Sequence, residues 1–564
     1  SMTHQKVLQA LRQADYLSPK YHVVIANPPY MGRRNMNSRL SAWAKSNYPN
    51  SQADLFSMFM ERCMNMITSD GFVGMINLPS WLFLSSFSGL RNTLVENYFI
   101  ESMLHMGRGI FGIDWGSTAF VVRKRKSHGR VGHFFKLHKK VFQHLYPEDI
   151  EKLFLLSKNN QAYKYDFTQY RGDSGVNEIS TISYSSGQRL HFSTTPEEFK
   201  KIPGNPIAYW LPNSVYEAFE RGPSFGDVAN PKVGMQTANN DFFLRLWWEP
   251  SVDETSIFKP SKKNWVAYSK GGDFRKWWGN NEHVLRYHNS GSLLRKQNNA
   301  TLPDERIYDV DRCTWSDISA GKPFAARRAP KYSFYDIKGH SFFPDEHGNG
   351  LLSYSNSNFF NLCINMLNPG LNFQVGDVKR VPAPNLIKLG ESSPLEEKCV
   401  LYSKKDWDTY ETSWDFTSLP LLNPDYHQPT LNVTYQKLRA HWRGMTLETQ
   451  RLEEENNRIF IEAYGLQDEI KPEVPLNEIT LTCNPHYRYG GDKSEEELEA
   501  LLLADTMREL VSYAVGCMFG RYALDKPGLI LANQGETIED YLKRVPEPSF
   551  PADDDNVIPM LDGD

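Results

Sequence analysis

Four consecutive residues carry groups that could hold the amine of a nucleobase: Asn27, Pro28, Pro29 and Tyr30. They follow an apolar run at residues 21–26, which predicts a strand that ends in a functional loop. Because two prolines restrict the backbone of that loop, the Asn27 side-chain oxygen and the Pro28 carbonyl could accept hydrogen bonds from an exocyclic amine while the Tyr30 ring stacks on an extruded base. These groups suit the methylation of adenine. The alternative is a proline-stiffened turn on a buried strand.

The composition is that of an ordinary globular protein with several domains. The chain has 564 residues, of which 40% are hydrophobic and 23% are charged, and this leaves enough apolar material for sizeable cores. No apolar stretch approaches the roughly 20 residues of a membrane helix, and no charged-then-apolar leader opens the chain. We therefore expect a cytoplasmic protein without a membrane partner.

The cysteines and the net charge indicate the cellular compartment and the way in which the protein could bind DNA. The six cysteines are scattered, with no Cys-x-x-Cys pair and no histidine at zinc spacing. This pattern predicts a reducing cytoplasm and no metal site. The net charge of -4 does not favour nucleic-acid binding over the whole surface. Any contact with DNA should therefore come from a local patch.

The two ends of the chain look like the results of cutting. Ser1-Met2 looks like a cloning or protease scar, and the acidic end at residues 553–564 carries no helix-ending signal. Only 26 residues precede Asn27, which leaves no room for an earlier cofactor-binding half. Residues 107–112 match the letters of a glycine-rich dinucleotide fingerprint, but no strand-to-helix unit surrounds them. They are predicted to form the loop of a strand hairpin.

The next hundred residues alternate between helical and strand patterns. The first helix has apolar side chains at helical spacing and should end at Asp70-Gly71. Alternation of this kind predicts an α/β fold with a parallel sheet. The predicted elements are a helix from residue 53 to 67, a strand at 72–78, a helix at 87–98, and a closing pair of strands at 100–106 and 117–122.

The order of these motifs resembles that of gamma-class adenine-specific DNA methyltransferases. The matching stretches are Asn27-Pro28-Pro29-Tyr30, Asp54-Leu55-Phe56, Gly71-Phe72, Pro79-Ser80-Trp81-Leu82, and Phe111 before Ser117-Thr118-Ala119. The resemblance implies the C-terminal half of a Rossmann-like sheet, with S-adenosylmethionine as cofactor and double-stranded DNA as partner. The family places a glycine-containing cofactor motif ahead of the first stretch, and this chain lacks it. The chain alone is therefore expected to be inactive.

The same resemblance assigns roles to single residues. Asn27, Pro28 and Tyr30 would bind and activate the target adenine, with Pro29 completing the catalytic loop. Phe111 would pack against the other face or the edge of the base. Asp54 would help to shape the wall between the cofactor and the base.

Beyond about residue 140 the patterns become short strands with frequent Gly, Pro and Asn, which predicts a recognition domain. One loop of this region, residues 233–241, concentrates the polar side chains Gln236, Thr237, Asn239 and Asn240. They could contact base edges or phosphates of DNA. They would equally suit a loop that hydrogen-bonds to itself, and the sequence leaves both possibilities open.

A local excess of positive charge follows this loop. Residues 259–338 contain 16 Lys or Arg against 8 Asp or Glu, in a chain that is acidic overall. Interleaved Trp and Tyr residues make the mixture typical of a nucleic-acid surface, although a solvated basic face is the alternative. The residues predicted to bind DNA here are Lys262, Lys263, Lys270, Arg275, Lys276, Arg327, Arg328 and Lys331.

Two stretches extend the resemblance beyond the catalytic region. Residues 234–241 (GMQTANND) and 371–382 (LNFQVGDVKRVP) resemble the target-recognition domains of type IIG enzymes and, more closely, of the PglX (BrxX) family of BREX phage-defence methyltransferases. The charge-rich helix predicted at 434–462 resembles the helical spacer of these enzymes. The resemblance implies other BREX proteins, and a phage inhibitor that mimics DNA, as partners.

The sequence therefore predicts an α/β catalytic region, a mixed α+β target-recognition domain and a helical C-terminal region. The predicted function is site-specific methylation of DNA adenine in phage defence. The alternatives are a type IIG restriction-modification enzyme and a mainly non-catalytic DNA-recognition subunit. The predicted boundaries are 1–140 for the catalytic region, 141–204 for a linker, 205–390 for target recognition, 391–480 for the helical spacer and 481–564 for the C-terminal helical region.

Overall fold

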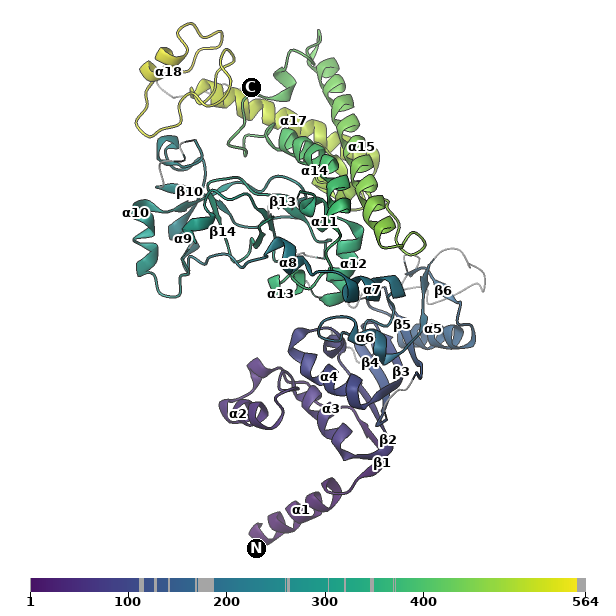
Figure 1. The fold of residues 1–564 in the computed structure, drawn as a ribbon. Helices are drawn as coiled ribbons and strands as arrows, with labels where there is room; N and C mark the ends of the chain where they lie inside the picture. The colour runs from purple at the N-terminus through teal and green to yellow at the C-terminus, as the bar shows by residue number, and fades with distance from the viewer. Residues whose placement is uncertain are drawn as a thin grey trace. The chain divides into compact units, whose positions relative to one another are not determined.

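A computed structural model gives the fold of the chain, which divides into two compact units (Figure 1). Unit one comprises residues 1–221 and 365–369, and unit two comprises residues 222–364 and 370–564. Within the described ranges no helix combines the length and apolarity needed to cross a bilayer. The structure describes residues 2–554 except for 111–115, 126–128, 140–142, 168–169, 171–186, 259, 261–263, 303, 319–320, 345–348, 369 and 371.

A six-stranded sheet forms the centre of unit one, in the order β1-β2-β4-β3-β5-β8. Strand β1 is parallel to β2, and β3 is parallel to β5, whereas β4 runs antiparallel between β2 and β3. The carboxyl ends of β1, β2, β3 and β5 therefore lie at the same edge of the sheet. The strands are β1 Tyr21–Ala26, β2 Ile67–Asn77, β3 Phe99–Met106, β4 Ser117–Arg123, β5 Gly132–Leu137 and β8 His191–Thr194.

The helices of unit one confirm the helical periodicity of the sequence. The larger helices are α1 Met2–Leu17, α2 Ser38–Asn47, α3 Leu55–Met66, α4 Ser88–Asn97, α5 Pro147–Asn159, α6 Pro196–Lys200 and α7 Asn213–Arg221. Single-turn helices are η1 Arg33–Asn35, η2 Pro79–Leu82 and η3 Ser85–Phe87, and a separate strand pair is β6 Lys164–Tyr165 with β7 Gln188–Arg189. Helix α3 buries Phe56, Met60 and Cys63 on one face, as its apolar spacing predicts.

The junction between α3 and β2 differs from the prediction. The helix ends at Met66, and β2 begins at Ile67, five residues before the predicted strand. Asp70 adopts a left-handed backbone with φ of 68°, and the register between β1 and β2 shifts between Tyr21 and Val23. Asp70-Gly71 thus forms an irregularity inside the strand, where the prediction placed the end of the helix.

Residues 141–204, predicted as a linker, are part of unit one. Strand β8 pairs with β5 and extends the sheet, while Ile150 and Leu153 of α5 are buried beside Phe135 of β5. The chain then returns to the sheet edge, because Ile207 N–H donates to the Leu82 carbonyl at 2.9 Å. The linker prediction is wrong, and so is the start of the recognition domain at residue 205. Short strands and a loop-rich composition concealed the pairing of β8.

Unit two begins with two small sheets. The order of the first is β14-β10-β11-β9 and that of the second is β13-β12-β15. The first sheet buries Val266, Tyr268, Leu285, Tyr287 and Phe334 in one apolar cluster. Its strands are β9 Leu244–Leu246, β10 Trp265–Ser269, β11 His283–Arg286 and β14 Ser333–Tyr335, and those of the second sheet are β12 Cys313–Trp315, β13 Ala326–Arg328 and β15 Ser341–Phe342.

Helices make up most of the remainder of unit two. The helices after residue 222 are α8 Phe225–Ala229, α9 Asn240–Phe243, α10 His288–Gly291, α11 Leu351–Ser355, α12 Asn358–Leu367, α13 Val375–Val378, α14 Leu386–Trp407, α15 Leu431–Ala463, α16 Pro485–Tyr489, α17 Glu495–Met518 and α18 Ile538–Arg544. The short helices are η5 Val252–Glu254, η6 Leu294–Lys296, η7 Glu305–Ile307, η8 Pro420–Leu422 and η9 Leu476–Glu478. Helix α15 buries Leu438 and Trp442 against Leu502 of α17. The long helix predicted at 434–462 is thus confirmed by α15.

Buried charges join the sheets of unit two to its helices. Lys276 and Glu453 of α15 form an ion pair in which neither side chain is more than 5% exposed. Trp277 Nε1 donates to Glu453 Oε1 at 2.7 Å. Arg275 lies 3.9 Å from Asp406 of α14. Because a buried charge without a partner is costly, these pairs require the sheets and helices to fold as one unit.

We predict that Lys276→Met lowers the free energy of unfolding of the full chain by about 3 kcal/mol, because Glu453 then keeps its buried charge without a counter-ion. Urea denaturation followed by tryptophan fluorescence measures this change. The control is Lys437→Met, on the exposed side of α15, which should change the free energy by less than about 0.5 kcal/mol. Equal denaturation midpoints for the two variants would contradict the prediction.

Candidate functional site

The loop that contains Asn27 follows the last residue of β1 directly. It lies at the sheet edge where parallel strands place their carboxyl ends, which is the usual position of sites in α/β folds. Pro28 is buried, whereas Asn27, Pro29 and Tyr30 are exposed. Within the described part of the chain, the Asn27 side chain makes no hydrogen bond. Its amide oxygen is therefore available to a ligand while Pro28 anchors the loop.

Asp54 holds this loop against the start of α3. Its Oδ1 accepts the backbone N–H of Met31 at 3.0 Å and that of Phe56 at 3.2 Å. Leu55 N–H donates to the Met31 carbonyl at 3.0 Å, and Arg33 N–H donates to the Ala53 carbonyl at 3.0 Å. One carboxylate thus caps α3 and fixes the residue after Tyr30. The predicted role of Asp54 beside a cofactor stays a prediction, and its observed role is to position the loop.

Aromatic packing sets the direction of Tyr30. Its ring meets Phe56 edge to face, with centroids 6.1 Å apart and planes at 80°, and Phe56 in turn packs on Phe87 at 5.6 Å. The Tyr30 side chain is still 37% exposed. Burial, and then the nearby charge of Asp54, raise the pKa of the Tyr30 hydroxyl. The loop therefore presents a neutral, partly open aromatic surface beside Asn27.

A buried polar network lies next to the loop, at the end of β2. Asn77 Oδ1 accepts hydrogen bonds from Trp81 Nε1 and from Thr118 Oγ1, both at 2.9 Å. None of the three side chains is measurably exposed. The network fixes the turn at Pro79–Leu82 against the sheet. Sequence reasoning did not single out Asn77, although a polar residue at the end of an apolar strand is a usable signal.

The outer side of β1 is open. Among the described strands β1 pairs only with β2, and its apolar residues Val23 and Ile25 are 55% and 81% exposed. An edge strand with exposed apolar residues is able to pair with a further strand. The Asn27 loop therefore adjoins an unpaired sheet edge.

Two predictions about loops in unit one have different outcomes. The described part of residues 107–112 connects β3 to β4, which pair antiparallel, so the hairpin prediction is confirmed for that part. A Cβ on Gly107 would lie 2.5 Å from the Gln143 carbonyl oxygen, and one on Gly109 would lie 2.2 Å from that of Leu145. Glycine at positions 107 and 109 therefore leaves room for the backbone carbonyls of Gln143 and Leu145. Phe111 lies outside the described residues.

The polar loop at residues 233–241 bonds largely to its own unit. Thr237 Oγ1 donates to Asn240 Oδ1 at 2.7 Å, and Asn239 Oδ1 accepts the backbone N–H of Phe242 at 3.2 Å. Gln236 Nε2 donates to the Asn299 carbonyl at 3.2 Å. These contacts favour the self-bonded alternative. Thr237 is only 1% exposed, so its predicted contact with DNA is wrong, and that of the other three residues stays a prediction.

The predicted basic patch is mostly a set of structural ion pairs. Arg275, Lys276 and Arg327 are 6%, 4% and 1% exposed, so the prediction that they bind DNA is wrong. A count of charges over residues 259–338 could not reveal these ion pairs, because the partners Asp406 and Glu453 lie far from Arg275 and Lys276 in the sequence.

The other cations predicted to bind DNA are paired where the structure describes them. Lys270 lies 2.8 Å from Asp336, and Lys331 lies 3.0 Å from Asp311. Arg328 binds Glu396 and Glu397. For Lys270, Arg328 and Lys331 the contact with DNA stays a prediction. Their carboxylate partners already balance part of their positive charge. Lys262 and Lys263 lie outside the described residues.

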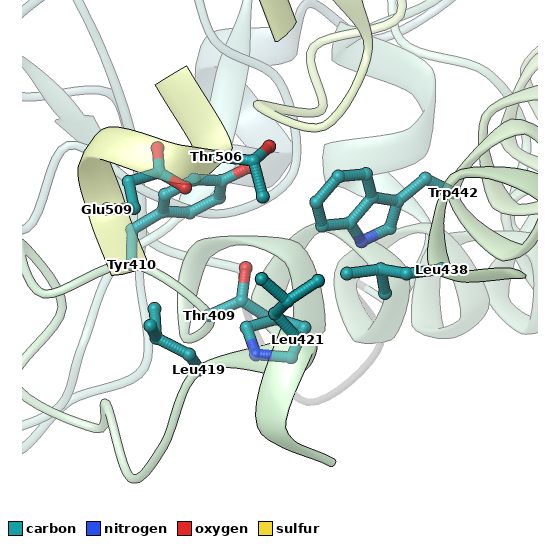
Figure 2. Close-up of a pocket in the computed structure, with 9 residues that line it drawn as sticks. Thr409, Tyr410, Leu419, Leu421, Leu438, Trp442, Thr506 and Glu509 are labelled. Carbon is teal, nitrogen blue, oxygen red and sulfur yellow. The ribbon is translucent and has the colours of Figure 1, made fainter. Parts of the chain in front are cut away.

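A small cavity in unit two contains none of the predicted site residues. Its volume is about 10 Å³, which is close to the space of a single water molecule. Figure 2 shows Tyr410 and Glu509 on one side of it and Leu438 and Trp442 on the other. A nucleotide or cofactor does not fit this space. The cavity is therefore a feature of helix packing.

We predict that Asp54→Ala loosens the Asn27 loop, because it removes the hydrogen bonds to Met31 and Phe56. Each such bond contributes about 1 kcal/mol, so the Met31 amide should exchange its hydrogen about fivefold to tenfold faster. Hydrogen-exchange mass spectrometry measures the rate. Asp304→Ala removes a comparable cap from η7 and should leave residues 27–33 unchanged. An unaltered rate at Met31 in Asp54→Ala would refute the positioning role.

Three kinds of comparison place the chain among known proteins. Residues 3–111 match the family model described as Eco57I restriction-modification methylase. The chain is 32% identical to adenine-specific methyltransferase BrxX of Escherichia coli O9:H4 (strain HS), over 99% of this chain and 43% of that protein. It is 31% identical to adenine-specific methyltransferase PglX of Lacticaseibacillus casei (strain Zhang), over 97% and 43%. The chain thus spans less than half the length of these two relatives.

A solved structure of the type IIL restriction-modification enzyme MmeI in complex with DNA matches 87% of this chain and 57% of that one, with 10% identity and a TM-score of 0.43. The sequence similarity to BrxX and PglX is much stronger. The resemblance inferred from the motifs is thus confirmed: nearly the whole chain is similar to the adenine-specific methyltransferases BrxX and PglX, and residues 3–111 are similar to Eco57I-type restriction-modification methylases.

Proposed function

We propose that this chain is the adenine-activating and DNA-recognising part of an S-adenosylmethionine-dependent DNA adenine methyltransferase. The observation that carries the proposal is the Asn27 loop, in which an unpaired amide and an open Tyr30 ring are fixed at the carboxyl edge of the sheet. The names of BrxX and PglX support the same reaction. We further propose that it works in the cytoplasm and marks self DNA in BREX phage defence.

The loop residues act on the target amine. The Asn27 oxygen and the Pro28 carbonyl accept hydrogen bonds from the two N–H groups of the amine. These hydrogen bonds draw the nitrogen lone pair out of conjugation with the ring and direct it toward the methyl donor. The Tyr30 ring stacks on the extruded adenine. Asp54 keeps both groups in place through Met31. Catalysis here is alignment, which agrees with a loop held by backbone hydrogen bonds.

The described residues around the loop do not by themselves form a site for S-adenosylmethionine. The Asp54 carboxylate already accepts two backbone N–H groups. The space beside Gly107 and Gly109 is filled by residues 143–145. We therefore derive no step through the cofactor. Its site is proposed along the open side of β1, with a further strand contributing, and this agrees with a chain that is inactive alone.

The architecture extends the proposal to the whole chain. We propose that the sheet of unit one is the C-terminal half of a Rossmann-like methyltransferase sheet. Unit two would supply target recognition through its small sheets and a helical spacer through α14, α15 and α17. Double-stranded DNA is the proposed partner, with Gln236, Asn239 and Asn240 among its contacts. Other BREX proteins, and a phage inhibitor that mimics DNA, are further proposed partners.

A second candidate is a DNA-recognition subunit in which methylation is subordinate. The incomplete cofactor site among the described residues favours it. The two candidates differ in whether Asn27 is needed for the function of the complex.

We predict that Asn27→Ala removes an acceptor from the desolvated amine, which costs about 1 to 3 kcal/mol or more in the transition state. Methylation should fall by roughly fivefold to 150-fold. The genomic locus that encodes the chain is expressed in a methylation-deficient host, and mass spectrometry of digested DNA gives the content of 6-methyladenine. Asn65→Ala, on the exposed side of α3, is the control. Equal methyladenine in both variants would reject the role of Asn27, and phage resistance that persists in Asn27→Ala would favour the subunit.

We predict that Tyr30→Ala weakens the binding of duplexes with a mismatched, easily extruded adenine. Stacking of a base on an aromatic ring is worth about 1 to 3 kcal/mol, so the affinity should fall by at least about fivefold. Tyr30→Phe keeps the ring and should bind as the original protein does. Fluorescence anisotropy measures both. A similar loss in Tyr30→Phe would mean that the hydroxyl, and not stacking, matters.

A further inference from the structure

A row of polar side chains crosses four strands at the catalytic edge of unit one. In the sheet register Asn77 of β2 pairs with Thr118 of β4, Thr118 pairs with His105 of β3, and His105 pairs with Lys136 of β5. Directly paired residues in neighbouring strands project to the same face. The four side chains therefore form one line that starts beside the Asn27 loop and ends at Lys136.

His105 is held in a fixed orientation under an aromatic cover. It is 1% exposed, its Nδ1 lies 3.2 Å from the Tyr209 hydroxyl, and its ring lies 6.4 Å from that of Trp210. Burial, and then the charge of Lys136, lower the pKa of His105 to about 3. The imidazole is therefore neutral. Nε2 of His105 is buried and has no hydrogen-bond partner among the described residues.

Lys136 is a cation without a carboxylate partner among the described residues. Its Nζ lies 4.6 Å from the centroid of the Trp210 ring. An aromatic ring stabilises a cation above it and so offsets part of the hydration energy that the cation loses on burial. A partly buried ammonium still lacks an anion to neutralise its charge. Burial lowers the pKa of Lys136 to about 8. At neutral pH the side chain is still mostly charged.

We propose that Lys136, held over the Trp210 ring, binds a phosphodiester group of the DNA backbone. The ammonium of Lys136 supplies the charge, and Trp210 holds the ammonium in place. The buried His105 lies beside Lys136 and does not itself contact the phosphate. The site rests on the proposed function, because it requires that DNA reach the catalytic edge.

The position of β5 in the sheet also indicates which phosphate of the DNA Lys136 would contact. Strand β5 lies four positions from β1 in the sheet, and neighbouring strands are about 4.8 Å apart, so Lys136 lies roughly 19 Å from the Asn27 loop. This distance corresponds to about five to six steps of B-form DNA at 3.4 Å per step. Lys136 would therefore contact the backbone flanking the target and would leave the flipped nucleotide to Asn27 and Tyr30.

The test is the salt dependence of DNA binding by the full chain. Anisotropy with a labelled 30-base-pair duplex of mixed sequence gives the affinity at several salt concentrations. Each phosphate contact contributes about 0.9 to the slope of log affinity against log salt. Lys136→Met should reduce the slope by about one and the affinity by about tenfold. Lys124→Met is the control, since Lys124 follows β4 at the opposite edge of the sheet.

A second arm uses pH and separates charge from packing. Between pH 7 and pH 9 the free protein loses the proton of Lys136, so its affinity for DNA should fall. In Lys136→Arg the charge persists and the affinity should stay nearly constant. His105 lies beside Lys136, and the rings of His138 and Tyr209 lie against that of His105. His105 stays neutral over this range, and burial raises the pKa of Tyr209 far above it.

The outcomes are distinguishable from failure of the proposed function. If no form of the chain binds DNA, the proposed function itself is contradicted. If the original chain binds DNA and Lys136→Met has the same salt slope, the phosphate site is overturned while the methyltransferase proposal stands. A pH dependence that persists in Lys136→Arg would likewise assign the effect to another group and overturn the site.

Discussion

The hydrogen bonds from Met31 and Phe56 to the Asp54 carboxylate are the constraint on which the Asn27 loop and the sheet edge beside it depend. A loop with two prolines has a restricted backbone, but it needs an external contact to point in one direction. Asp54 supplies that contact and caps α3 with the same oxygen. Since α3 is fixed by its buried apolar face, the core of unit one determines the position of Asn27 and Tyr30.

The sheet then brings other groups to the same edge. The carboxyl ends of β1, β2, β3 and β5 lie there, and polar residues of β2, β4, β3 and β5 form a continuous row from Asn77 to Lys136. The part near the loop is fully hydrogen-bonded and supports the fold. The far part contains, among the described residues, a cation without a carboxylate partner and a buried imidazole nitrogen without a hydrogen-bond partner. This difference separates the structural end of the row from the end that can bind a ligand.

The sequence predicted the elements that have a clear period and missed those that depend on distant pairing. Helices α3 and α4 and the strand before Asn27 followed from apolar spacing and prolines. Strand β8 has only four residues and pairs with β5 more than 50 positions earlier, so no local pattern marked it.

The same limit explains the basic region. Sixteen cations in 80 residues suggested a surface, yet Lys276 pairs with Glu453, which is 177 residues away. Charge counts report composition, whereas burial depends on the fold. The Asn27 motif was readable because its chemistry lies in four adjacent residues. The sequence did not single out Lys136, because its significance comes from the Trp210 ring and from the absence of a carboxylate partner among the described residues.

The central claim is that the Asn27 loop presents adenine for methylation at a defined DNA sequence. The most direct measurement is base-resolved sequencing of modified DNA from a methylation-deficient host that carries the genomic locus of this chain. The account predicts methyladenine at one fixed motif across the genome. Genomic DNA without modified adenine, or with modification confined to another base, would contradict it.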